Sequence, residues 1–206
     1  MKYKLGIDFD NTLVNYDRLF YEVALDLNLI NASVLPNKKA VRDFLIKQDL
    51  ENSFTKLQAE IYGKHIMRSI PDNSLISSLK RVKSADIDIC IVSHKTMFPY
   101  LGPKYNLHEA ALNWLKKNKF FSKDGLDMSL NDVFFEPTKE SKIERIVSEK
   151  CFFFIDDLPE IISLIPDSVG KVLFSDFTVK NKHKNFIQSV SWPDIADFLI
   201  SSINKL

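Results

Sequence analysis

The sequence predicts an α/β fold, a Rossmann-like parallel sheet sandwiched by helices, with a small all-helical unit inserted after the first strand. Two observations support this prediction. Continuously apolar segments alternate with amphipathic helical patterns, which is typical of a parallel sheet covered on both faces. Between residues 15 and 70, by contrast, only helical periodicity is present. With 206 residues, of which 45% are hydrophobic, the chain is long enough for one core with such an insertion.

The strands of the predicted sheet are short. Each is an apolar run bounded by polar residues, so we expect both faces of the sheet to be buried. In a sheet of this kind, ligands bind at the carboxyl ends of the strands. The segments predicted as strands are residues 3–9, 87–92, 133–135, 151–155 and 171–174.

Helical periodicity defines the insertion. Phe20, Val23 and Leu27 recur at intervals of three and four, as on one face of a helix, and Asp17 can cap its start. Two further amphipathic patterns follow before residue 70. We therefore predict an α/β core formed by residues 1–14 and 71–206 and a helical insertion formed by residues 15–70. In the core, helices are predicted from about residues 75, 108, 141, 159 and 193.

The charge balance excludes several classes of partner. The chain has 28 Lys and Arg against 27 Asp and Glu, so no overall field favours a nucleic-acid polymer or a membrane surface. No apolar window approaches the roughly 20 residues of a membrane span. Asp8 and Asp10 interrupt the first apolar run, which is unlike a signal peptide. We expect a cytoplasmic protein, and we expect the basic run at 180–184 to be a solvated loop.

The chain has two cysteines, and both lie in predicted strands. Cys90 and Cys151 each stand inside an apolar run, where a cysteine behaves as a small buried hydrophobe. This context favours reduced thiols packed in the core over a disulfide framework or a metal site.

Polar side chains end three of the predicted strands. The first strand ends in Asp8 and Asp10, the second in Ser93, and the fourth in Asp156 and Asp157. Because the carboxyl ends of parallel strands meet at one edge, we expect these groups to lie together. Taken singly, Ser93 or the Asp156–Asp157 pair would more often cap a helix or form a turn. Four carboxylates in one crevice require a cation, and oxygen ligands suit Mg²⁺.

In their order, these groups resemble the motifs of the haloacid dehalogenase (HAD) superfamily of phosphohydrolases. Asp8, Asp10 and Thr12 match the family's Asp-x-Asp-x-Thr motif, Ser93 matches its second motif, and the acidic pair after the fourth strand matches its last. The resemblance covers roughly residues 4–175. It also implies a lysine at the start of the helix before the fourth strand. We favour Lys142 for this role by its spacing, with Lys139 as the alternative.

The resemblance implies a Mg²⁺-dependent phosphatase that works through an aspartyl-phosphate. Asp8 would be the nucleophile and Asp10 the general acid and base. The implied metal ligands are Asp8, Asp10 through its backbone carbonyl, Asp156 and Asp157, without a decision on which of the last two contacts the ion. The implied phosphate ligands are Ser93, Lys142 and Asn11, and the supporting residues are Thr12, His94 and Lys95.

The implied substrate is a small phosphorylated metabolite such as a sugar phosphate. In the family's dehalogenases the position of Asp10 is not an acid, so an aspartate there favours a phosphatase. The helical insertion resembles the C1 type of cap, which closes over small substrates. Two alternatives stay open: a 5′-nucleotidase acting on (deoxy)nucleoside monophosphates, and a non-catalytic module that binds a phosphorylated ligand. The substrate, the oligomeric state and the pathway are not decided by the sequence.

Overall fold

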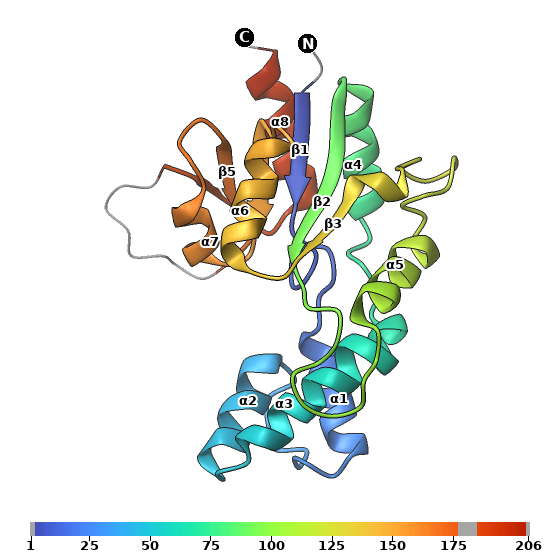
Figure 1. The fold of residues 1–206 in the computed structure, drawn as a ribbon, viewed down its shortest axis with the longest axis vertical. Helices are drawn as coiled ribbons and strands as arrows, with labels where there is room; N and C mark the ends of the chain where they lie inside the picture. Colours follow the sequence, from blue (N-terminus) through green and yellow to red (C-terminus); the bar gives the residue numbers. More distant parts are fainter. Residues whose placement is uncertain (1–2, 177–184, 205–206) are drawn as a thin grey trace. The chain divides into compact units, whose positions relative to one another are not determined.

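A computed structural model of the chain describes residues 3–176 and 185–204 and divides it into two compact units (Figure 1). The α/β core consists of Met1–Leu13, Asp72–His94 and Asn118–Leu206, and the helical unit consists of Val14–Pro71 and Lys95–Lys117. The basic run at 180–184 lies outside the described residues. Among the helices of the described ranges, none combines the length and the apolar character that a membrane span requires.

The core is built on a sheet of six parallel strands in the order β3-β2-β1-β4-β5-β6. In the sheet, Ile7 of β1 lies opposite Ile91 of β2 and Ile155 of β4, so these three strands reach their carboxyl ends close together. The strands are β1 (Tyr3–Ile7), β2 (Ile87–His94), β3 (Val133–Glu136), β4 (Phe153–Asp156), β5 (Gly170–Leu173) and β6 (Ile187–Gln188). The predicted parallel α/β fold is confirmed, and β6 is an addition to it.

Helices cover both faces of the sheet (Figure 1). On one face, Ile146 and Ile161 pack with Phe154 in a buried hydrophobic cluster. On the other face, Phe198 meets the ring of Phe153 edge-on, with ring centroids 5.5 Å apart. The first face carries α6 (Lys139–Ser148) and α7 (Pro159–Leu164), and the second carries α4 (Leu75–Ser84) and α8 (Trp192–Ile203), while the short turn η3 (Leu130–Asp132) precedes β3.

The helical unit has its own aromatic core. Phe20 stacks on Phe54 at 5.6 Å and meets Tyr62 edge-on at 5.9 Å. Leu27, predicted on the buried face of the first helix, is 48% exposed because that helix ends at Asp26. The elements of this unit are α1 (Asp17–Asp26), α2 (Lys38–Lys47), α3 (Glu51–Ala59), the π-helical turn η1 (Glu60–His65), the 3₁₀ turn η2 (Ile66–Arg68) and α5 (Leu107–Lys117).

The structure places Lys95–Lys117 in the helical unit, whereas the sequence predicted this segment as part of the α/β core. The reason is the packing of α5. Its buried Trp114 donates an indole N–H to the carbonyl oxygen of Ser69 at 3.1 Å, and Lys117 donates to the carbonyl oxygen of Met67 at 2.7 Å. The loop before α5 is held as well, because Tyr105 hydrogen-bonds to Glu60. The remaining predicted boundaries differ from the observed ones by one residue.

The two tryptophans report on the two units separately, since Trp114 lies in the helical unit and Trp192 in the core. We predict that Leu45→Ala, which empties a fully buried position of α2, destabilises the helical unit by about 2–5 kcal/mol. Leu35→Ala is the matched control, because Leu35 is 67% exposed and its loss should cost under about 0.5 kcal/mol. Urea unfolding followed by Trp114 fluorescence in a Trp192→Phe background measures both. Equal midpoints for the two variants would contradict the prediction.

Candidate active site

The carboxyl ends of β1, β2 and β4 bring three polar side chains into the core. Asp8 follows β1, Ser93 lies near the end of β2, and Asp156 is the last residue of β4. They are only 5%, 1% and 0% exposed. The backbone N–H of Asp8 donates to the carbonyl oxygen of Ile155 at 2.9 Å, so the sheet pairing continues up to the carboxylate. The ends of these apolar strands therefore position polar side chains where they are almost inaccessible to solvent.

Lys142 completes this cluster from helix α6. Its ammonium donates to Oδ1 of Asp8 and to Oδ2 of Asp156, at 2.6 Å in each case, and the side chain is 2% exposed. Thr138 fixes the start of α6 by accepting a hydrogen bond from the backbone N–H of Ser141, which sets the turn from which Lys142 projects. Lys139, the alternative lysine, pairs instead with Glu160 and keeps 38% of its side chain exposed. Lys142 is thus the lysine that lies with the carboxylates.

Burial and charge shift the titration of these groups. Burial raises the pKa of Asp8 to about 8; the charge of Lys142 opposes this shift, and neighbouring carboxylates add to it. Burial raises the pKa of Asp156 in the same direction. Burial alone would lower the pKa of Lys142, but the charges of Asp8 and Asp156 more than offset it and raise that pKa. One ammonium therefore does not offset the burial of Asp8 together with the charges of its neighbouring carboxylates, and the site retains affinity for a proton or another cation.

The donor set fits a hard divalent cation. Asp8, Asp156 and Asp157 each offer a carboxylate oxygen, and these three atoms lie within 4.8 Å of one another. Asp10, predicted as a ligand through its backbone carbonyl, contributes no side-chain oxygen to this group. Both oxygens of Asp156 already accept hydrogen bonds, Oδ1 from the backbone N–H of Leu158 at 2.9 Å and Oδ2 from Lys142. An all-oxygen set of this kind suits Mg²⁺.

Two buried hydroxyl groups have no hydrogen-bond partner among the residues that the structure describes. They are Oγ of Ser93 and Oγ1 of Thr12. Thr12 is 4% exposed, so water does not satisfy either group freely. A buried hydroxyl without a partner costs about 1–3 kcal/mol, which an oxygen-rich ligand could recover.

Three other predicted site residues, Asn11, His94 and Lys95, have different surroundings. Asn11 adopts a left-handed φ of 58°, in a turn where the backbone N–H of Leu13 donates to the carbonyl oxygen of Phe9 at 3.1 Å. His94 is exposed, and its ring nitrogen Nε2 lies 3.1 Å from the carbonyl oxygen of Pro137. Lys95 belongs to the helical unit, where its ammonium is 5.2 Å from the centroid of the Tyr62 ring.

Phe154 is a contact of the site that the sequence did not predict. Its ring centroid lies 5.5 Å from the ammonium of Lys142, within the range of a cation–π interaction. Phe152, Phe153 and Phe154 are adjacent in one apolar run, and nothing in the sequence distinguishes the ring that α6 places under the lysine.

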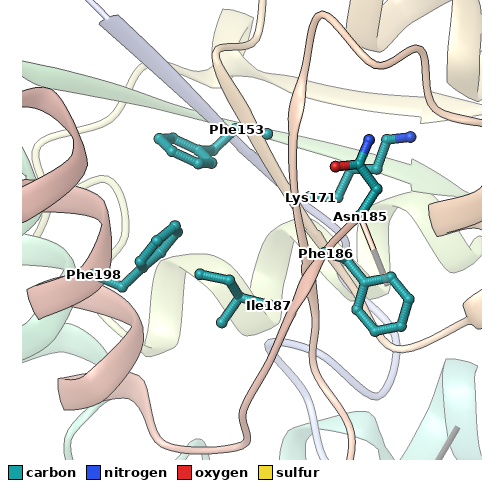
Figure 2. A pocket seen from close by; sticks show the side chains of 7 residues that line it. Phe153, Lys171, Asn185, Phe186, Ile187 and Phe198 are labelled. Carbon is teal, nitrogen blue, oxygen red and sulfur yellow. The ribbon is translucent and has the colours of Figure 1, made fainter. Parts of the chain in front are cut away.

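A separate cavity of about 300 Å³ lies beside β5 and β6 and contains none of the predicted site residues. Figure 2 shows Phe153, Phe198 and Ile187 along one part of it and Lys171 and Asn185 along another. Three phenylalanines, Phe153, Phe186 and Phe198, are among its lining residues. We assign it no role in the candidate active site.

The position of Lys142 predicts a large difference between the two lysines. Lys142→Met leaves Asp8 and Asp156 without their cation and should destabilise the protein by about 3–5 kcal/mol, whereas Lys139→Met removes an exposed pair worth under about 1 kcal/mol. Without Lys142 the pKa values of the two carboxyl groups rise further, so the folded variant binds more protons than the folded wild type. Its loss of stability relative to the wild type should therefore be greater at about pH 8 than at about pH 5. Denaturant unfolding at both pH values measures this. Equal losses for the two variants would refute it.

Comparison with known proteins shows the fold. No protein-family model and no curated protein matches the chain. Among solved structures, a haloacid dehalogenase-like family hydrolase from Xanthomonas campestris is 8% identical with a TM-score of 0.56, covering 100% of this chain and 99% of its own. A haloacid dehalogenase-like hydrolase from Bacteroides fragilis is 16% identical (TM-score 0.54, 92% and 95% covered), and a dehalogenase solved as an intermediate complex is 11% identical (TM-score 0.58, 97% of each chain covered). The α/β core and helical unit of this chain thus have the fold of haloacid dehalogenase-like hydrolases.

Proposed function

We propose that the protein is a Mg²⁺-dependent phosphomonoester hydrolase that acts through an aspartyl-phosphate on a small phosphorylated metabolite such as a sugar phosphate. The observation that carries this proposal is the buried carboxylate of Asp8, hydrogen-bonded to Lys142 at the carboxyl edge of the sheet. A nucleophile needs a fixed orientation and little competing water, and the position of Asp8 provides both.

The proposed reaction has two steps. In the first, a carboxylate oxygen of Asp8 bonds to phosphorus while the bond to the ester oxygen breaks, and Asp10 gives that oxygen a proton. In the second, Asp10 takes a proton from water, the water oxygen bonds to phosphorus, and the carboxylate of Asp8 leaves, so that inorganic phosphate is released. The division into two displacements is the usual advantage of a covalent intermediate.

Ser93 and Lys142 are the proposed donors to the phosphoryl oxygens. The hydroxyl of Ser93 is buried without a partner among the described residues, as expected for a donor whose acceptor arrives with the substrate. The ammonium of Lys142 already faces the nucleophile. Donors held in place before the reaction stabilise charge that builds up in the transition state. Asn11, in the turn after Asp10, is a further candidate through its position.

Asp8 and Asp157 are the proposed ligands of Mg²⁺. Both oxygens of Asp156 accept hydrogen bonds, so its main proposed task is to orient Lys142. When bound, Mg²⁺ would supply positive charge opposite the phosphoryl oxygens. The carboxylate oxygens of Asp8 and Asp157 belong to the group of three that lie within 4.8 Å of one another, which supports this assignment.

We also propose that the helical unit serves as a cap of the C1 type. Its first segment begins at Val14, directly after the turn that contains Asp10, and its second begins at Lys95, directly after Ser93 and His94. Movement of such a unit would therefore act on the chain next to two site residues. Caps of this kind exclude water and select the leaving group.

A dehalogenase is the alternative that the structural neighbours suggest, because one of them is described as a dehalogenase. Dehalogenation and phosphate-ester hydrolysis differ in the leaving group. A halide departs as a stable anion, whereas the alkoxide of a phosphate ester needs a proton, which Asp10 could supply. Asp10 therefore favours the phosphatase. A nucleotidase and a non-catalytic phosphate-binding module remain alternatives within the same site.

Activity on an aryl phosphate with Mg²⁺, followed by a panel of sugar phosphates and nucleoside monophosphates, tests the proposal. We expect Asp8→Asn to abolish turnover, and Asp10→Asn to lower kcat by about 10²- to 10⁴-fold while binding of the substrate persists. Lys139→Met is the control and should retain activity, since it lies outside the carboxylate cluster. If Asp8→Asn turned over substrate as fast as the wild type, the result would contradict the proposal. Tight binding without turnover over the whole panel would favour the binding module.

Mg²⁺ should also stabilise the folded protein in the absence of substrate. A ligand at a hundredfold excess over its Kd adds about 2.7 kcal/mol, so the midpoint of thermal unfolding should rise with Mg²⁺ concentration. Asp157→Asn is expected to remove most of this rise. Asp124→Asn is the matched control, because Asp124 is an exposed carboxylate paired with Lys119 outside the site. The assignment of Asp157 fails if both variants respond to Mg²⁺ alike.

A further inference from the structure

Two buried thiols meet in the interior of the α/β core, in the same apolar cluster as Phe154. Cys90 lies in the middle of β2 and Cys151 lies just before β4, on the two sides of β1. Their sulfur atoms are 3.7 Å apart. Cys90 is 0% and Cys151 4% exposed, and both are free cysteines. The residues are separated by 61 positions in the sequence, so the fold brings them together.

Gly6 makes this approach possible. It lies on β1 directly opposite Cys90, in the strand between the two cysteines. A Cβ atom on Gly6 would come within 2.8 Å of the sulfur of Cys151 and within 2.5 Å of the ring of Phe154. Any larger residue at position 6 would therefore displace the sulfur of Cys151 and the ring of Phe154 from their observed positions.

The contact between the two sulfur atoms distinguishes the two thiols, while burial opposes ionisation of both. The hydrogen bond between the sulfur atoms lowers the pKa of Cys151 and raises that of Cys90, so Cys151 is the thiol that ionises first. Lys4 adds positive charge that favours the thiolate of Cys151, although Lys4 also pairs with Glu149 at 2.8 Å. Cys151 is also the more exposed of the two, and a small oxidant would reach it first.

We propose that Cys90 and Cys151 are an oxidative modification site that forms a reversible intramolecular disulfide with hydrogen peroxide. The sulfur atoms need to close from 3.7 Å to about 2.05 Å. Because Cys90 and Cys151 come from the two sides of β1, the backbone at Cys151, just before β4, must move toward β2 as well. The proposal goes beyond the proposed hydrolase function and does not depend on it.

The chemistry balances with peroxide as the oxidant. The thiolate of Cys151 attacks one peroxide oxygen, the O–O bond breaks, and the departing hydroxide takes up a proton to give water and a sulfenic acid on Cys151. The sulfur of Cys90 then attacks that of Cys151, the S–O bond breaks, and the hydroxyl leaves as a second water with the proton of Cys90. Each sulfur loses one electron, and the peroxide gains two.

The test uses the reduced, full-length chain under native conditions. After treatment with hydrogen peroxide, the protein is denatured, remaining thiols are alkylated with N-ethylmaleimide, and intact mass and linked peptides are measured. We expect a monomer that has lost two hydrogen atoms, takes up no N-ethylmaleimide and yields a Cys90–Cys151 linked peptide. A phosphine reductant should restore both alkylation sites.

Cys90→Ser and Cys151→Ser are the matched controls, and thermal unfolding of their reduced forms establishes that they fold. In Cys90→Ser the remaining Cys151 should form a sulfenic acid that dimedone traps, and neither variant should form the intramolecular link. The proposal is overturned if the native wild type stays fully alkylatable, gains oxygen without a link, or cross-links only between molecules. It is also overturned if the link forms only when the chain is unfolded before oxidation.

Discussion

The ammonium of Lys142 lies between two buried carboxyl groups and opposes the rise in pKa that burial imposes on both. Asp8 and Asp156 are both nearly inaccessible to water, and each lies 2.6 Å from that ammonium. Removal of one partner from such a buried pair leaves an uncompensated charge, which is far more costly than the loss of a surface pair. The ends of β1 and β4 and the start of α6 are therefore constrained by one side chain. Thr138, which caps α6, contributes to the site from outside it.

Several features of the fold and the site could be predicted because they follow from local chemistry. Continuous apolar runs indicate strands buried on both faces, and polar residues at their ends indicate the functional edge. The choice between Lys139 and Lys142 is different. Residues three apart lie on neighbouring positions of a helix, so periodicity alone does not decide which one reaches the interior. Only the packing of α6 against β2 and β3 separates the buried lysine from the one that pairs with Glu160.

The placement of α5 shows the same limit on a larger scale. Its pattern predicts one buried face, and the structure indeed buries Leu107, Ala111 and Trp114. An amphipathic pattern does not determine which surface of the protein the buried face of the helix packs against. Trp114 finds its partner at Ser69, 45 positions earlier in the chain, and this contact puts α5 in the helical unit. The two-residue strand β6 escaped prediction for another reason, since so short a segment has no detectable period.

The helical unit is assembled from two separate stretches of the chain, Val14–Pro71 and Lys95–Lys117. The chain therefore passes between this unit and the α/β core four times, and β2 lies between the two stretches in the sequence. A gene fragment that carried only the first stretch would lack the buried face of α5 and the indole that binds Ser69. Recombination at one site could not exchange this unit between proteins. Both stretches would have to be replaced together. Variation in the unit is therefore expected to arise by point substitution more readily than by recombination that transfers the whole unit.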